Sequence, residues 1–426
     1  MPSFEISYTL RNVLLGSSLL GCLGGVMGGF TLLRRQSLLG DALAHAALPG
    51  VCIAFLLTSS KQPLPLLTGA LCAGLLGALY VVLVVRGSRI KEDSAIGMVL
   101  SVFYAVGIVL LTRIQKLPGG NQSGLDKYLF GQAAALVQED LVVMGGVGVV
   151  LVAAVILLWK ELKLLTFDRA FGQSLGLPMR SLEVVLTCLL VVVVVVGLQT
   201  VGVVLMVATL ITPAAAARQW TDRLGSMVLL SAAIGGISGA AGAVLSASFQ
   251  RLPTGPTIVL VSSSVLLVSL LFAPRRGILW SMWRERVFAT RIRRENLLKD
   301  LYLLGERHGG WSSYVPFPIV LGMRGDRAGR TRSDVRRLVR AGLLERSGDG
   351  LRLTPEGQLA AERLVRKHRL WEVYLTRRLD LPVDHVHRDA EAMEHALSDA
   401  AVNEFEERLD FPAVDPHGRP IPRRRE

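Results

Sequence analysis

The chain has 426 residues, of which 51% are hydrophobic and 19% are charged, and its formal net charge at pH 7 is +13. The part that ends at Pro274 holds 17 Lys and Arg and 11 Asp and Glu, whereas the shorter part from Arg275 holds 30 and 23. This uneven distribution excludes a disordered, fibrous or single-domain soluble protein and indicates a membrane part followed by a charged soluble part.

The first 274 residues contain the apolar runs. A helix that crosses a bilayer needs about 20 mostly apolar residues. Nine runs qualify: 10–33, 42–59, 64–85, 95–112, 141–159, 182–198, 200–217, 226–249 and 256–273. The pair 182–198 and 200–217 could instead be one span and a re-entrant piece, which would leave eight. We therefore predict an all-α polytopic bundle of about nine transmembrane helices.

Loop charges predict the orientation of this bundle, because cytoplasmic loops collect Lys and Arg. With nine spans and the N-terminus outside, the inside loops hold most of the basic residues, including Arg34, Arg35, Arg169 and Arg275. The same count places everything after Arg275 in the cytoplasm. We expect a multi-pass protein of a bacterial cell membrane, in contact with lipid, whose charged C-terminal part is cytoplasmic.

Asp41 and His45 are the most informative polar residues near a span. They are four residues apart, so on a helix they share one face. A carboxylate and an imidazole on one face suit a divalent first-row metal ion. The alternative is an N-capping Asp with a hydrogen-bonded interior His.

A short amphipathic segment, 163–178, lies between two spans on the basic side, with Phe167 and Phe171 four residues apart. It suits a docking helix for a cytoplasmic partner or an interfacial helix on lipid headgroups. None of the eight lysines follows a glycine, so the chain has no Walker A loop. The chain is therefore not expected to be a P-loop ATPase, and we predict no enzymatic activity for it.

Residues 10–274 resemble the permease subunits of metal-uptake ABC transporters of the manganese, zinc and iron class. The matching stretches begin at Gly40-Asp-Ala-Leu-Ala-His, Lys91-Glu-Asp-Ser, Lys127-Tyr-Leu-Phe-Gly, Leu198-Gln-Thr-Val-Gly, Leu210-Ile-Thr-Pro and Leu252-Pro-Thr-Gly-Pro. The resemblance implies a second permease chain, a pair of ATPase subunits and an extracytoplasmic metal-binding protein. It also implies pathway metal contacts at Asp41 and His45. Glu92 and Asp93 match too, but acids at a helix start favour the helix dipole anyway.

The same resemblance makes 163–178 the coupling helix that docks on the ATPase. The residues it assigns to coupling are Phe167, Asp168, Arg169, Phe171, Gly172 and Gly176. After a basic connector, 275–294, the pattern predicts helices at 295–305, 331–342, 355–379 and 383–398, followed by a basic tail. We divide the soluble part into a degenerate winged-helix-like domain, 295–354, and a metal-binding and dimerisation region, 355–426.

Histidines and acids gather at ligand spacing on the last two predicted helices. They are His368, Glu372, His387, Glu391, Glu394 and His395. Such nitrogen and oxygen donors suit Mn, Fe or Zn. The alternative is a solvated face with i, i+4 ion pairs.

Residues 295–422 resemble the diphtheria-toxin-repressor family of metal-dependent regulators, through Leu351-Arg-Leu-Thr-Pro-Glu-Gly, Arg366-Lys-His-Arg-Leu-Trp-Glu, Val386-His-Arg-Asp-Ala-Glu-Ala-Met-Glu-His and Asp415-Pro-His-Gly-Arg-Pro-Ile-Pro. The resemblance implies that the His and Glu cluster binds a regulatory metal. Two departures stand out. The family's first-helix ligands correspond here to Asn296 and Lys299, and proline-rich 309–318 replaces the first half of the helix-turn-helix.

DNA is a candidate partner of the soluble part, because one predicted helix is strongly basic. Its arginines are Arg330, Arg332, Arg336, Arg337 and Arg340. We predict a permease subunit of an ABC importer for Mn, Fe or Zn with a cytoplasmic metal-responsive domain. The alternatives are a membrane-tethered, metal-dependent transcription regulator and an ion-coupled secondary metal carrier.

Overall fold

The computed structural model describes residues 8–59, 62–116, 131, 133, 136–249, 252–307, 310–311, 313–324, 328–382, 386, 390–391, 393–395 and 397–423. The chain divides into two compact units, Met1–Ser281 and Met282–Glu426. Each unit has its own hydrophobic core. The division falls inside the predicted basic connector.

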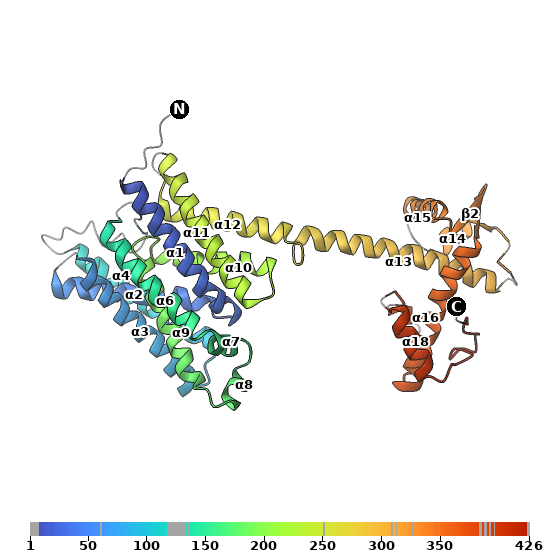
Figure 1. Ribbon diagram of the computed structural model, residues 1–426, viewed down its shortest axis with the longest axis horizontal. Helices are drawn as coiled ribbons and strands as arrows, with labels where there is room; N and C mark the ends of the chain where they lie inside the picture. The colour runs from blue at the N-terminus through green and yellow to red at the C-terminus, as the bar shows by residue number, and fades with distance from the viewer. Residues whose placement is uncertain are drawn as a thin grey trace. The chain divides into compact units, whose positions relative to one another are not determined.

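The first unit is a bundle of helices, shown in blue to yellow in Figure 1. Nine helices of the described part are long and apolar enough to cross a membrane: α1 (Tyr8–Leu33), α2 (Ser37–Thr58), α3 (Pro63–Gly87), α4 (Glu92–Gln115), α6 (Gln138–Leu157), α9 (Met179–Gly197), α10 (Val203–Trp220), α11 (Leu224–Ser248) and α12 (Thr254–Phe272). The two runs that might have been one span are separate helices, α9 and α10. Gly202, with φ +84°, lies at the start of α10.

Helices α1 and α2 form the centre of the bundle. In each of these two helices, 67% of the residues in the most apolar stretch are buried, compared with 22% in α6 and in α12. Helix α1 crosses α11 at two glycines, where a Cβ atom on Gly21 would lie 2.1 Å from the carbonyl oxygen of Gly235. These two glycines therefore allow the backbones of α1 and α11 to approach closely.

Ion pairs join loops that the charge count assigns to the same side of the membrane. Arg34, after α1, lies 2.6 Å from Glu183 in the first turns of α9. Arg169, in the loop between α6 and α9, lies 2.9 Å from the same carboxylate. Arg276, after α12, pairs at 2.6 Å with Asp222 between α10 and α11. Each contact therefore places the loops that it joins at the same end of the bundle.

The second unit begins within α13 (Ile278–Arg307), so the predicted connector and the predicted helix 295–305 form one helix. A three-stranded antiparallel sheet follows, with the order β1 (Val315–Pro316), β3 (Gly350–Leu353), β2 (Leu344–Ser347). Gly348, with φ +58°, turns the chain between β2 and β3. Helices α14 (Phe317–Arg324) and α15 (Ala328–Arg340) complete a winged-helix arrangement.

Helix α14 corrects the expectation that prolines replace the first helix of the helix-turn-helix. The described residues between the end of α13 and Pro316 form no helix, and Pro316 itself lies in β1. Pro318, however, is the second residue of α14, where its missing N–H would have no partner inside the helix anyway. The basic helix α15 (Ala328–Arg340) is therefore preceded by a short helix.

The last part of the unit is helical. Thr354 caps α16 (Pro355–Arg378) by accepting a hydrogen bond from the backbone N–H of Gly357, and Ser398 caps α18 (Asp399–Arg408) in the same way. Apolar side chains of the two helices share a small core with Leu409 and Ile421. Of the predicted helix 383–398, residues 386, 390, 391 and 393 are helical, whereas His387 lies outside the described residues.

Candidate metal sites

Asp41 and His45 lie on α2, in the centre of the membrane bundle. Asp41 Oδ1 is 3.5 Å from His45 Nε2, and both side chains are largely buried. The position before α2 is Gln36, which makes no side-chain cap bond. Asp41 is therefore not the N-cap of α2, and the capping alternative is wrong.

The imidazole of His45 keeps one nitrogen available. Its Nδ1 atom is buried and has no hydrogen-bond partner within the described part of the chain. Tyr104 of α4 packs its ring against the imidazole edge to face, with ring centroids 4.8 Å apart. A buried imidazole nitrogen without a partner, beside a carboxylate, fits a pair that meets a metal cation in transit.

Tyr104 is a neighbour that the sequence analysis missed. The only sequence signal was an aromatic residue inside a span of a chain with 6% aromatic residues. Glu92, by contrast, lies in the first turn of α4 and accepts a hydrogen bond from Gln36. This contact fits the helix-start role that the sequence favoured for Glu92.

The segment predicted to couple the permease to an ATPase folds as two short helices, α7 (Trp159–Phe167) and α8 (Arg169–Ser174). Asp168 separates them and caps α8, because its Oδ1 accepts a hydrogen bond from the N–H of Phe171 at 2.9 Å. Phe167 and Phe171 are 57% and 52% exposed. The loop thus holds two aromatic rings at the surface on a rigid frame.

The structure explains why two positions of this loop are glycines. A Cβ atom on Gly172 would lie 2.0 Å from Cε of Met179, and Gly176 has a φ of +77°. Arg169 is held by Glu183 at 2.9 Å. The residues assigned to coupling therefore divide into three that shape the loop (Asp168, Gly172 and Gly176), one that ties it to α9 and two exposed rings.

In the second unit, His368 and Glu394 form the centre of the predicted regulatory cluster. Nδ1 of His368 is 2.6 Å from Glu394 Oε2, and its Nε2 is 3.2 Å from Glu372 Oε1 on the same helix. Glu394 is fully buried, and its other oxygen accepts a 2.6 Å hydrogen bond from Nζ of Lys299. The cluster is therefore an ion-pair network between α13, α16 and the segment around 394.

His395 extends this network toward α13. Its Nδ1 is 2.6 Å from Glu295 Oε2, and its Nε2 is 2.8 Å from Asn296 Oδ1. The two first-helix positions that depart from the family, Asn296 and Lys299, thus contact the predicted ligands directly. Glu391 is exposed and lines a cavity of about 140 Å³ beside His368 and Glu372.

Electrostatics within the network favour the charged forms. Burial lowers the pKa of His368, but its hydrogen bonds with Glu372 and Glu394 outweigh burial, so the pKa is raised overall. Burial raises the pKa of Glu394, but the bond with His368 and the charge of Lys299 outweigh it, so the pKa is lowered overall. Cation and anion stabilise each other in this site.

This arrangement is closed to a metal ion as it stands. Across the described ranges, no three His, Cys, Asp or Glu side chains are arranged to hold one. Both oxygens of Glu394 and both nitrogens of His395 already have partners. The structure brings His368, Glu372 and Glu394 together, but His368 bonds to both carboxylates and Lys299 holds Glu394.

The basic helix α15 divides its residues cleanly between two faces. The five arginines predicted to contact DNA are all exposed: Arg330, Arg332, Arg336, Arg337 and Arg340. Val335 and Leu338 pack into the core, and buried Asp334 pairs with Arg293 of α13 at 3.1 Å. The exposed face is free of acids, as a helix that meets phosphates requires.

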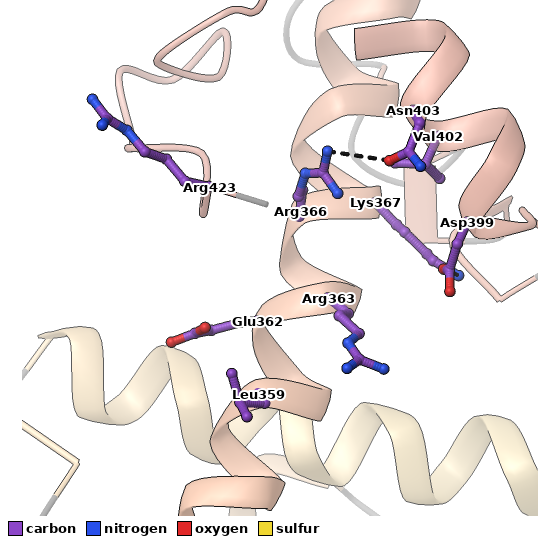
Figure 2. A pocket seen from close by; sticks show the side chains of 9 residues that line it. All are labelled: Leu359, Glu362, Arg363, Arg366, Lys367, Asp399, Val402, Asn403 and Arg423. Carbon is purple, nitrogen blue, oxygen red and sulfur yellow. Dashed lines mark hydrogen bonds and ion pairs between the residues drawn. The ribbon is translucent and has the colours of Figure 1, made fainter. Parts of the chain in front are cut away.

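Figure 2 shows a separate pocket of about 240 Å³ between α16, α18 and Arg423. Its polar groups pair with one another: Arg366 donates to Asn403 at 3.4 Å, and Lys367 lies 2.8 Å from Asp399. The Lys367 pair holds the pKa of Asp399 below its usual value. Four basic side chains line this pocket and make it unsuited to a cation: Arg363, Arg366, Lys367 and Arg423.

Comparisons with known proteins match both units. The model of the ABC 3 transport family matches residues 7–273, and that of the iron dependent repressor, metal binding and dimerisation domain matches residues 354–423. The manganese transport system membrane protein MntC of Bacillus subtilis is 44% identical over 370 residues, covering 87% of this chain and 84% of that protein.

Two further matches cover different lengths. A probable metal transport system membrane protein of Chlamydia trachomatis is 32% identical over 436 residues, covering 96% of this chain and 95% of its own length. The solved structure of PsaBC from Streptococcus pneumoniae in complex with Fab matches with a TM-score of 0.57 at 34% identity. It covers 63% of this chain and 93% of that chain. The two metal transport membrane proteins therefore match residues of both units, whereas the PsaBC structure covers 63% of the chain.

Proposed function

Because the chain belongs to the ABC 3 transport family, we propose that it is the permease subunit of an importer for a divalent transition metal, Mn²⁺, Fe²⁺ or Zn²⁺. Its second unit carries the iron dependent repressor metal-binding and dimerisation domain. The observation that carries the choice of a metal cargo is the buried pair of Asp41 and His45 on the central helix α2. Relatives that match are named as manganese, zinc or metal transport membrane proteins.

In this proposal Asp41 and His45 contact the cation as it passes. A neutral imidazole offers the lone pair of a buried nitrogen, and the carboxylate lowers the cost of bringing a dication into the bundle. A pair of protein ligands binds a metal ion more weakly than a closed set of four to six. Weak binding suits a pathway, because the ion must also leave.

The importer requires partners that the chain itself does not supply. We propose a second permease chain, a cytoplasmic ABC ATPase and an extracytoplasmic metal-binding protein. The exposed rings of Phe167 and Phe171 are the proposed contact with the ATPase. Arg34, Arg169 and Glu183 would hold this contact to α1 and α9, so that movement of the ATPase reaches the bundle.

The experiment is metal uptake by cells that express the chain with the ATPase and binding protein from neighbouring genes. Radioactive Mn²⁺ and Zn²⁺ are offered separately, with an ATPase variant that cannot hydrolyse ATP as the control. Uptake that depends on ATP hydrolysis supports an ABC importer. Uptake that continues with the inactive ATPase and follows an ion gradient would support a secondary carrier instead.

We also propose that the second unit is a cytoplasmic regulator that responds to the imported metal. Its candidate ligands are His368, Glu372, His387, Glu391, Glu394 and His395. What supports this is their nitrogen and oxygen chemistry and the match of the metal-binding family model to residues 354–423. In the arrangement described above, a metal ion would have to replace bonds that the cluster already makes.

DNA binding is a second candidate role of the same unit. The observation that favours it is the exposed, acid-free row of five arginines on α15 within a winged-helix fold. Such a row would contact phosphates and lose affinity as salt rises. Fluorescence anisotropy with duplex DNA from the promoter region of the operon, at several salt concentrations, tests it.

A further inference from the structure

Lys299 pairs with Glu394, the most buried of the predicted regulatory metal ligands in the described part of the chain. Its side chain is 8% exposed, and its ammonium lies 2.6 Å from Oε1 of Glu394, which is 0% exposed. The other oxygen of Glu394 lies 2.6 Å from Nδ1 of His368. Nε2 of His395 lies 3.4 Å from the same oxygen that Lys299 holds. The ammonium of Lys299 therefore pairs with the carboxylate that two other predicted ligands, His368 and His395, also contact.

A buried ammonium and a divalent metal ion would both pair with the carboxylate of Glu394. Both are cations that need the negative charge of the carboxylate, and neither tolerates the other at contact distance in a poorly screened interior. The ammonium has the advantage of being tethered on α13, so it is present at a fixed, high effective concentration. A metal ion must displace it.

Asn296 and Glu295 reinforce the closed arrangement one turn earlier on α13. They hold the two ring nitrogens of His395 at 2.8 Å and 2.6 Å. His395 therefore has no ring nitrogen left for a metal while these bonds persist. The exchange that opens the site has to move side chains of α13 away from the segment around residue 394.

We propose that Lys299 is a built-in competitor of the regulatory metal. Its ammonium neutralises Glu394, keeps the cluster closed at low metal concentration and raises the concentration at which the second unit responds. This inference rests on the proposed metal-responsive role of that unit. It assigns the response threshold to one side chain outside the predicted ligand set.

The test is calorimetric titration of the full-length chain in detergent with Mn²⁺ and with Zn²⁺, comparing the wild type with Lys299→Met. The pathway pair on α2 is present in both proteins, so its contribution cancels in the difference. We expect the variant to gain a site that binds metal roughly tenfold or more tightly than any corresponding wild-type site. Lys299→Gln, which retains a hydrogen-bond donor without the charge, should do the same.

Lys367→Met is the matched control, because Lys367 also pairs with an acid, Asp399 at 2.8 Å, in the same unit. It should leave metal affinity unchanged. The double variant Lys299→Met/Glu394→Gln removes both charges and should lose the added affinity while staying folded. Gel filtration and melting curves check folding of every variant.

The outcomes separate this inference from the role on which it rests. Equal affinity in the wild type and in both Lys299 variants would overturn the competition and leave the metal-responsive role intact. No binding to the second unit in any folded variant would overturn both. If neither Lys299 variant folds, the ammonium is a structural requirement and not a displaceable competitor, which also overturns the inference.

Discussion

His45 and His368 each have a carboxylate four residues away on the same helix, and the surroundings of the two histidines differ. On α2, His45 faces Asp41 at 3.5 Å and retains a buried nitrogen with no partner in the described structure. On α16, His368 has Glu372 on one nitrogen and Glu394 on the other. The same helical spacing thus produces an open pair in one unit and a saturated network in the other.

The difference fits the two roles that we propose for these units. A transport pathway has to bind a cation briefly, so incomplete coordination and an available lone pair are useful. A regulatory site has to exist in two stable states, and the state without metal needs its own cation. In the proposed regulatory site Lys299 of α13 supplies that cation, whereas no lysine or arginine of the described residues forms an ion pair with Asp41.

Removing the partner of a buried charge should have the largest effect in the saturated network. Glu394→Ala leaves the ammonium of Lys299 buried without its anion, which should destabilise the second unit by about 3–5 kcal/mol. Thermal unfolding of the full-length chain, followed by the tryptophans of that unit, measures the loss. Glu391→Ala, at an exposed position, should change stability by less than about 0.5 kcal/mol. Equal effects of the two changes would contradict the network.

In the open pair, the same kind of change should affect transport rather than folding. Asp41→Ala and His45→Ala should each reduce metal uptake by about 100-fold, since each removes one of two contacts with the cargo. Membrane insertion and detergent gel filtration should be unchanged. Asp93→Asn, at the start of α4, should keep uptake near the wild-type rate. Normal uptake by both single variants would remove the pathway assignment.

The coupling loop connects the open pair to its energy source. Phe171→Asp should reduce ATP-driven uptake by about tenfold, because a charge replaces an exposed apolar contact with the ATPase. Co-purification of the ATPase and metal-dependent ATP hydrolysis measure the effect. Leu38→Asp, also at an exposed leucine but outside the segment 163–178, serves as a matched surface control. An unchanged complex with Phe171→Asp would leave the loop with only a lipid-facing role.

The smallest expected change concerns DNA, at the other end of the regulatory unit. Arg336→Gln and Arg337→Gln should each weaken binding to duplex DNA by a few-fold and reduce the salt dependence by about one counterion. Both arginines are exposed, so folding should be unaffected. Anisotropy titrations at several salt concentrations measure both quantities. If the wild type shows no salt-dependent binding, α15 is not a DNA-contacting helix.

Several features of the molecule could be predicted because they repeat along the chain. The nine spans follow from runs of apolar residues, which local composition encodes directly. The pairing of Asp41 with His45 follows from the helical period alone. The basic face of α15 also follows from spacing, since Arg332, Arg336 and Arg340 recur at the helical period. Each of these depends on residues that are close in sequence.

Other features depend on residues that are far apart in sequence, and only the tertiary structure decided them. The chain itself indicated that His368 and Glu394 were ligand types and that Lys299 departed from the family pattern. It could not indicate that Lys299 reaches Glu394 across 95 positions, or that Tyr104 of α4 lies against His45 of α2. A periodic pattern fixes which face of a helix is apolar or charged, whereas packing decides what that face meets. Whether a cluster of histidines and acids is open to a metal ion is therefore a property of the fold.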